Sequence, residues 1–320
     1  MKTPKISVAL PCYGEGERAP TASWLFAAID AAEMAGFDRV VVSDHLVFGS
    51  DMGGYSDPLS GGREGGRQPT GPDGLWLEPL TVLAMAAART TRVRLATTIL
   101  LAALRRPAVL AKTAATIDYL SGGRLDLGVG VGWQRAEYEA CGLDFGSRGQ
   151  ALDRSLEICQ LLWEQDVMSF ESDGLAFESV HMMPKPIQKP LPVWVSGTLN
   201  PAVVRRLSRF GAAWVPWGED AQNLKASIPT MRNHMEEAGR DASSLGVVSR
   251  VQVVRSNDGG TDALATAQNA VRLVELGVTD VVVAPPGLDD PVIQGRAVGN
   301  EETAVAMKEL VEAFWRICSG

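Results

Sequence analysis

Short apolar runs rich in β-branched residues alternate along the chain with longer segments whose apolar residues recur at helical spacing. The expected strands are residues 6–10, 40–43, 93–98, 125–130, 192–196, 213–216, 247–254 and 280–284. The expected helices include residues 21–35, 107–120, 148–163, 201–210, 224–238, 261–276 and 302–317. Eight strand–helix pairs predict an α/β fold of the closed (β/α)8 TIM-barrel type, and such a barrel accommodates residues 1–320 as one domain.

Glycine follows four of the expected helices, at Gly36, Gly211, Gly239 and Gly277. A residue in the left-handed conformation commonly ends a helix, and glycine adopts that conformation without steric cost. We therefore expect all four in that conformation. Three of them lead directly into an expected strand, and this order of helix, glycine and strand is typical of a βα barrel.

Two segments interrupt the alternation. Residues 48–74 follow the second expected strand and are rich in Gly, Pro, Ser and Asp, and a long connection without regular structure is usually a lid or a binding loop. Residues 167–189 carry alternating apolar residues around Ser172, Asp173 and Gly174, which predicts an inserted β-hairpin. The residues that select the substrate are expected in these two insertions.

Composition narrows the partners and the compartment. Hydrophobic residues make up 46% of the chain, and the net charge of -8 argues against nucleic acid, whose phosphates require clustered Lys and Arg. The four cysteines show no CxxC spacing, so buried, reduced thiols are expected. The chain shows neither a signal-peptide core nor a run of about 20 apolar residues, which predicts a cytoplasmic protein with no membrane partner.

The C-terminal ends of the strands carry the catalytic groups in barrels of this type, so the residues there are the first candidates. Ser43, Asp44 and His45 follow the second expected strand, and His45 is one of only three histidines. A histidine exchanges a proton near neutral pH, while Asp44 could fix its surroundings or bond a ligand. The alternative is a histidine that only satisfies backbone groups of the loop.

Two further strand ends could approach a ligand closely. Residues 128–132 lack the spacing of a dinucleotide fingerprint because Trp133 stands where a third glycine belongs, so they indicate only close backbone packing or a nearby ligand. Residues 196–198 precede a helix that begins at Pro201, and N–H groups at a helix start suit a phosphate. An ordinary helix cap explains the same residues.

Other chemistries find little support. His45, His181 and His234 show neither HxH nor HExxH spacing, which argues against a metal site. The sequence contains neither GxxxxGK[ST] nor GxSxG, so nucleoside triphosphate and serine-esterase chemistry lack their usual motifs.

Five stretches together resemble the luciferase-like monooxygenase superfamily, and particularly its branch of oxidoreductases that depend on coenzyme F420, an 8-hydroxy-5-deazaflavin. They are VVSDH at 41–45, RLATTIL at 94–100, RPAVLAK at 106–112, LSGGRL at 120–125 and GVGVGW at 128–133. The resemblance covers nearly the whole chain, and LSGGR with the glycine-rich strand end is its most specific part. It implies a barrel of the bacterial-luciferase type, with insertions over the C-terminal mouth and the coenzyme ring laid across that mouth.

The resemblance also implies which residues form the site. Asp44 and His45 would lie beside the ring, with His45 as the acid/base candidate, and a cis peptide between Thr98 and Ile99 would back the ring. The other coenzyme-binding candidates are Thr97, Gly130 and Gly132, with Ser196, Gly197 and Thr198 for the phosphate. The candidate substrate-pocket residues are Cys12, Trp133, Tyr138 and Trp217. The family further implies a homodimer.

One departure from the family pattern concerns the proton donor. Sugar-phosphate dehydrogenases of this branch carry a catalytic glutamate after the glycine strand, where this chain has Trp133, and the nearby Glu137 and Glu139 are offset. The mismatch argues against oxidation of a sugar phosphate and leaves the proton donor unassigned. Trp133 suits the wall of an apolar or aromatic substrate pocket, or ordinary packing.

Three functions remain open. The leading one is transfer of a hydride between coenzyme F420 and a small organic substrate, with the barrel supplying orientation and an acid/base group. The alternative is a monooxygenase dependent on flavin mononucleotide (FMN), which uses oxygen and reduced flavin from a partner reductase. A non-catalytic binding protein is the third, and the retained Asp44 and His45 disfavour it.

Overall fold

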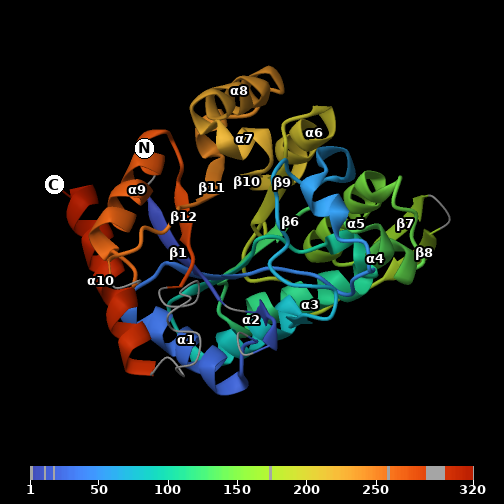
Figure 1. The fold of residues 1–320 in the computed structure, drawn as a ribbon. Coiled ribbons are helices and arrows are strands. Elements are labelled where there is room, and N and C mark those ends of the chain that lie inside the picture. The colour runs from blue at the N-terminus through green and yellow to red at the C-terminus, as the bar shows by residue number, and fades with distance from the viewer. Residues whose placement is uncertain are drawn as a thin grey trace.

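The computed structural model describes residues 3–10, 12–16, 19–172, 175–257, 260–285 and 300–319. Eight parallel strands close into a barrel in the order β1-β12-β11-β10-β9-β6-β5-β3, with helices around it (Figure 1). The predicted (β/α)8 TIM barrel is therefore confirmed. The barrel strands are β1 (Lys5–Ala9), β3 (Arg39–Val42), β5 (Arg94–Thr97), β6 (Leu125–Val129), β9 (Val193–Gly197), β10 (Gly211–Pro216), β11 (Gly246–Arg250) and β12 (Asp280–Val283).

The predicted helices are present with bounds that differ by a few residues at most. They are α1 (Ala22–Ala35), α3 (Pro107–Leu120), α5 (Arg148–Glu164), α6 (Pro201–Phe210), α8 (Leu224–Glu237), α9 (Ala263–Glu275) and α10 (Asn300–Ser319). The described residues contain three more α-helices, namely α2 (Pro79–Arg89), α4 (Arg135–Ala140) and α7 (Glu219–Gln222). Across the ranges given above, no helix combines the length and the apolar character needed to cross a membrane.

The barrel interior contains an apolar layer and, at the N-terminal ends of the strands, a polar one. The apolar layer consists of Val41, Ala96, Trp194, Ala213, Val248 and Val282. In the polar layer Arg39 forms ion pairs with Asp126, at 2.6 Å, and with Asp280. Ser7 donates to Asp280 at 2.6 Å. These contacts close the bottom of the barrel, so a ligand site is expected at the opposite, C-terminal mouth.

The LSGGR run forms a structural joint at the bottom of the barrel. Gly122 and Gly123 have φ values of 72° and 84°, a left-handed conformation that favours glycine, and they lead the chain out of α3. Arg124 is 8% exposed and donates to the carbonyl groups of Ala87, Thr90, Ser121 and Val93. The LSGGR run thus holds α2, α3 and the start of β5 together at the bottom of the barrel, away from the mouth.

The prediction of left-handed glycines holds at three of the four positions. Gly36, Gly239 and Gly277 have φ values of 85°, 74° and 104°. For Gly211 the prediction is wrong, because its φ is −73° and strand β10 begins on this residue without an intervening turn.

Residues 48–74, which we call the lid, are more ordered than the sequence suggested. The lid contains two 3-10 helices, Gly53–Ser56 and Pro58–Ser60. It leads into the short strand β4 (Leu75–Trp76), which pairs antiparallel with β2 (Tyr13–Gly14). This small ribbon connects the lid to the chain that leaves β1.

The predicted hairpin is present, but it does not cover the mouth. Strands β7 (Met168–Ser172) and β8 (Leu175–Val180) pair antiparallel, and Asp173 and Gly174 of the expected turn lie outside the described residues. Figure 1 shows the hairpin at the outer side of the barrel beside α5. The chain after it binds the bottom of the barrel, where Gln188 donates to the carbonyl of Leu125, the first residue of β6. The expectation that both insertions cover the mouth is therefore wrong for the hairpin.

Candidate functional site

His45 follows β3 at the C-terminal mouth, and its side chain is 9% exposed. Its Nδ1 lies 3.1 Å from Oε2 of Glu137, which is fully buried in the first turn of α4. The other carboxylate oxygen of Glu137, Oε1, accepts the backbone N–H of Leu46 at 2.7 Å. The structure therefore gives His45 the carboxylate partner that the sequence left unassigned.

Sequence reasoning missed Glu137 because the residue is offset from the family position occupied by Trp133. One signal could have identified it. Glu137 belongs to the segment that follows β6, and in a barrel this segment lies at the same end as the segment that follows β3 and carries His45.

Aromatic rings enclose His45. The ring centroids of Phe48 and Trp76 lie 4.4 and 4.7 Å from its imidazole, and that of Trp133 lies 5.8 Å away. Tyr13 stacks on Trp76 at 4.3 Å. Apart from the contact with Glu137, the described part of the chain offers the His45 ring no hydrogen bond. The second ring nitrogen, Nε2, is therefore the atom that could serve a ligand.

Asp44 lies behind the site. Its buried carboxylate accepts two hydrogen bonds from Arg105, at 2.6 and 3.1 Å, and one from the backbone N–H of Leu101 at 2.8 Å. Burial acts to lower the pKa of Arg105, but its hydrogen bonds with Asp44 and Glu78 outweigh this effect and raise that pKa. The expectation that Asp44 acts directly on coenzyme or substrate is not supported, because it anchors the segment after β5 to the end of β3.

The segment after β5 has the backbone geometry that the resemblance implied. The peptide bond between Thr98 and Ile99 is cis. The hydroxyl of Ser43 donates to the carbonyl of Thr98 at 3.1 Å, and Arg250 donates to the Ser43 hydroxyl at 3.4 Å. Ser43 thus connects the end of β3, the cis peptide and a cation at the end of β11.

Three of the coenzyme-binding candidates are positions of close packing around this segment. Thr97 is fully buried, and its hydroxyl donates to the carbonyl of Gly128 at 2.6 Å. A Cβ on Gly130 would lie 2.3 Å from Cδ1 of Ile99, and Gly132 has a φ of 68°. These residues shape the backbone of the mouth, and none of the three offers a side chain to a ligand.

Two buried polar atoms at the mouth have no hydrogen-bond partner among the described residues. They are the hydroxyl of Thr98 and the indole N–H of Trp133, a residue that is 5% exposed. Buried donors are normally satisfied, so these two unsatisfied donors at the mouth suit a ligand with polar edges. The residues present therefore fit a flavin or deazaflavin ring, which carries carbonyl oxygens and ring nitrogens.

The loop at Ser196, Gly197 and Thr198 fits a phosphate less well than expected. The N–H groups at the start of α6 are already bonded, because Asn200 caps those of Ala202 and Val203 and Asp220 accepts that of Leu199. The hydroxyl of Thr198 donates to the carbonyl of Trp217 at 3.2 Å. The N–H groups at the start of α6 are therefore not free to bind a phosphate, and the assignment of Ser196, Gly197 and Thr198 to a phosphate rests on the resemblance alone.

The lid is attached to the far side of the mouth through Trp217, which follows β10. The indole N–H of Trp217 donates to the carbonyls of Gly61 and Gly62, at 3.1 and 3.0 Å. The guanidinium of Arg63 lies 5.6 Å from the centroid of the Trp217 ring, a cation–π contact. The lid therefore spans the mouth from β3 to β10.

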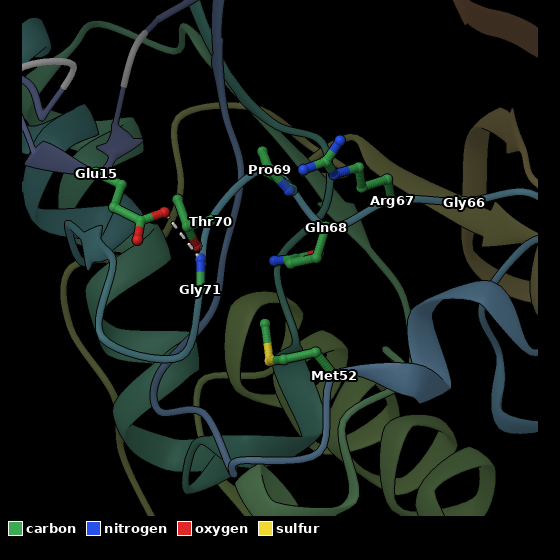
Figure 2. A pocket seen from close by; sticks show the side chains of 8 residues that line it. All are labelled: Glu15, Met52, Gly66, Arg67, Gln68, Pro69, Thr70 and Gly71. Carbon is green, nitrogen blue, oxygen red and sulfur yellow. Dashed lines mark hydrogen bonds between the residues drawn. The ribbon is translucent and has the colours of Figure 1, made fainter.

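The lid also lines a cavity of about 650 Å³, which Figure 2 shows from close by. Its lining residues are Glu15, Met52, Gly66, Arg67, Gln68, Pro69, Thr70 and Gly71. Thr70 accepts the indole N–H of Trp76 at 2.9 Å, and the Trp76 ring lies against that of His45, so Trp76 connects a lining residue of the cavity to the histidine. The volume falls within the usual range of small-molecule sites.

A smaller cavity of about 340 Å³ lies where β11 and β12 end. Arg250 and Arg255 line it together with Val251, Gln252, Val253, Val282 and Ala284. The loops after the seventh and eighth strands often bind phosphate in TIM barrels. The positive charges of these two arginines therefore favour an anionic group in this cavity over one at the start of α6.

Two of the candidate pocket residues are part of the packed interior. Cys12 is fully buried, its thiol contacts the backbone of Ser43, and burial raises its pKa to about 11. Tyr138 is fully buried as well, and its hydroxyl donates to the carbonyl of Val131 at 2.6 Å. Neither side chain reaches the open mouth.

Over the described ranges, no group of three or more His, Cys, Asp or Glu side chains could hold a metal ion.

The sequence matches the family model described as luciferase-like monooxygenase over residues 13–272. The chain therefore belongs to the luciferase-like monooxygenase family. An uncharacterized protein of Mycobacterium tuberculosis is 32% identical over 210 residues, which is 66% of this chain and 70% of that protein. The F420-dependent glucose-6-phosphate dehydrogenase of Segniliparus rotundus is 28% identical over 230 residues, 70% of this chain and 62% of that enzyme.

Several solved structures share the fold at low sequence identity. The monooxygenase RslO1 from Streptomyces bottropensis superposes with a TM-score of 0.75 at 20% identity, covering 98% of this chain and 99% of that one. An F420-dependent secondary alcohol dehydrogenase in complex with an F420-acetone adduct gives a TM-score of 0.73 at 18% identity, with the same coverage. The fold is thus shared with one protein named as a monooxygenase and one named as an F420-dependent dehydrogenase.

Proposed function

We propose that the chain is an oxidoreductase that transfers a hydride between coenzyme F420 and a small organic substrate. The observation that carries the proposal is the setting of His45. It is a buried imidazole at the barrel mouth, held at Nδ1 by Glu137 and two residues from the contact between Ser43 and the cis peptide. The F420-dependent enzymes among the sequence relatives support the choice of coenzyme.

The chain's own residues supply what hydride transfer needs besides the coenzyme. When bound, the deazaflavin supplies a two-electron hydride carrier. The segment with Thr98 and Ile99 would back the ring, and the free donors of Thr98 and Trp133 would bond its polar edge. Transfer of a hydride to or from a substrate carbon is matched by movement of a proton on a neighbouring heteroatom, and Nε2 of His45 is the group that could exchange that proton.

The surroundings of His45 favour a substrate with an apolar body over a sugar phosphate. Phe48, Trp76 and Trp133 form an apolar wall around the imidazole and keep water from it. A sugar phosphate presents several hydroxyl groups, and aromatic faces leave such groups without partners. We therefore place glucose 6-phosphate, the substrate named for two relatives, below less polar alcohols or carbonyl compounds.

Titration of the purified protein with coenzyme F420 and with FMN tests the proposal. We expect saturable binding of F420, and tight binding of FMN with no binding of F420 would overturn it. With a panel of alcohols and oxidised F420, His45→Asn should bind the coenzyme normally but reduce it at least about 100-fold more slowly, since acid/base catalysis contributes at least that factor.

A monooxygenase is the second candidate, because the matching family model is named for monooxygenase chemistry, and its coenzyme would be FMN. It predicts consumption of oxygen when the protein is supplied with reduced FMN and a reductase. Coenzyme reduction without oxygen consumption would exclude it. The homodimer and the partner reductase implied by the resemblance stay predictions.

A further inference from the structure

The two carboxylate oxygens of Glu137 have partners with different hydrogen-bonding capacity. Oε1 faces the backbone N–H of Leu46 at 2.7 Å, and a backbone N–H can only donate. Oε2 faces Nδ1 of His45 at 3.1 Å, and a ring nitrogen donates or accepts according to the tautomer. Leu46 therefore fixes which end of the residue at position 137 must be an acceptor.

We propose that Glu137 is a positioning residue that holds the proton of neutral His45 on Nδ1, so that Nε2 carries a lone pair. When Glu137 is ionised, neither of its oxygens carries a proton, so Oε2 accepts from Nδ1–H. This inference rests on the proposed function only in its consequence for catalysis. In the resting enzyme His45 is then a base at Nε2 and takes a proton from the substrate as hydride leaves the substrate carbon.

Glu137 also stabilises His45 after the proton has moved. A carboxylate bonded to Nδ1 lowers the free energy of the imidazolium that forms when Nε2 is protonated, as it does in catalytic triads. Because Glu137 is fully buried, water screens this attraction little. The same carboxylate also bonds the backbone of Leu46, two residues before the lid begins at Phe48. Glu137 therefore holds both His45 and the start of the lid in place.

The neighbouring ionisable groups do not offer the ring another charged partner. Asp44 and Arg105 are bonded to each other. Tyr138 and Cys141 lie beside Glu137, and burial raises the pKa of each, so both stay protonated at neutral pH. Among the described residues, Glu137 is thus the charged group that bonds to the His45 ring.

Glu137→Gln tests the inference with almost no change of shape. Leu46 still requires an oxygen acceptor, so the amide must place its oxygen toward Leu46 and its nitrogen toward His45. That nitrogen can only donate, and Nδ1 must then accept, which moves the ring proton to Nε2. We therefore expect the substitution to invert the tautomer of His45 and leave the fold intact.

The measurement is nitrogen NMR of protein with ¹⁵N-labelled histidine, which distinguishes protonated from unprotonated ring nitrogens. The chain has only three histidines, so His45→Asn assigns the signals of His45. Spectra are recorded over a series of increasing pH values, and the tautomer is read where the nitrogen shifts of His45 no longer change with pH. We expect Nδ1–H in the wild type and Nε2–H in Glu137→Gln.

The matched control is Glu237→Gln. Glu237 contacts His234 at 3.3 Å on the exposed surface, and its substitution should leave the His45 signals unchanged. Nε2–H in the wild type overturns the inference even if Glu137→Gln fails to fold, and so does the same tautomer in both proteins. Titration of the wild type with coenzyme F420 is read separately, so failure to bind F420 sinks the proposed function and leaves the tautomer result standing.

Discussion

The guanidinium of Arg105 donates to both carboxylate oxygens of Asp44, at 2.6 and 3.1 Å, in a region where neither side chain is more than 12% exposed. This pair joins the end of β3, which carries His45, to the segment after β5, which carries the cis peptide. This buried ion pair therefore helps to set the position of the candidate base relative to the back of the ring site.

Arg105→Met should destabilise the protein strongly. It leaves Asp44 as a buried carboxylate without its counter-charge, and breaking a buried pair in this way costs about 3–5 kcal/mol. The measurement is the free energy of unfolding in urea. Arg209→Met is the control, because its pair with Glu157 is half-exposed and such pairs contribute about 0–1 kcal/mol. Equal effects of the two substitutions would contradict this assignment.

Trp217→Phe should loosen the lid and leave the barrel unchanged. The substitution keeps an aromatic ring but removes the N–H that bonds the carbonyls of Gly61 and Gly62. We expect faster amide hydrogen exchange in residues 53–66, with a loss of about 0.5–1.5 kcal/mol of local stability. Trp163→Phe removes a comparable bond to the carbonyl of Ala111, outside the lid, and should leave lid exchange as in the wild type.

Gly128→Ala and Gly130→Ala should differ in severity. A Cβ at position 128 would lie 2.0 Å from the backbone carbonyl of Thr97, which cannot move without breaking the barrel. A Cβ at position 130 would meet the flexible end of the Ile99 side chain at 2.3 Å, which can rotate away. We expect Gly130→Ala to fold with a loss of about 1–3 kcal/mol and weaker coenzyme binding, and Gly128→Ala to abolish folding. Similar thermal unfolding of the two variants would contradict this difference.

The four thiols should react with iodoacetamide at very different rates. Burial raises the pKa of Cys12 to about 11, so at pH 8 only about one thiol in a thousand would be a thiolate, and the side chain is fully covered. Cys141 and Cys318 are partly exposed and should be labelled first, as mass spectrometry of digested protein would show. Labelling of Cys12 as fast as that of Cys318 in the folded protein would contradict the packing described.

The raised pKa of Cys12 also determines how the stability of the fold changes with pH. The folded-state pKa of Cys12 is raised from 9.0, so the unfolded chain loses this proton first. The contribution of the thiol to stability is complete below about pH 9 and is lost as the pH rises toward about 11. Urea unfolding at pH 8 and pH 10.5 should show lower stability at the higher pH, and a smaller decrease in Cys12→Ala.

Much of the fold follows from the sequence because its signals are local. The alternation of strands and helices depends on burial at periods of 2 and about 3.6 residues, and these periods can be counted without tertiary contacts. The exceptions have physical reasons. Gly211 begins a strand and so does not adopt the left-handed conformation, and the hairpin after α5 binds the outer side and bottom of the barrel, where no local pattern directs it.

The sequence predicted where the candidate site lies, but it did not predict which residues bond to one another there. The sequence by itself determined that His45 stands at the mouth of a barrel, because it follows an apolar strand. Only the tertiary structure decided that Glu137, 92 residues away, bonds to Nδ1 of His45. It also decided that Arg105 forms an ion pair with Asp44, and that protein groups accept the N–H groups at the start of α6. The physical reason is that closure of the barrel brings the ends of distant strands together. A periodic pattern shows which face of a strand or helix is buried, but it does not show which residue of another element lies against that face.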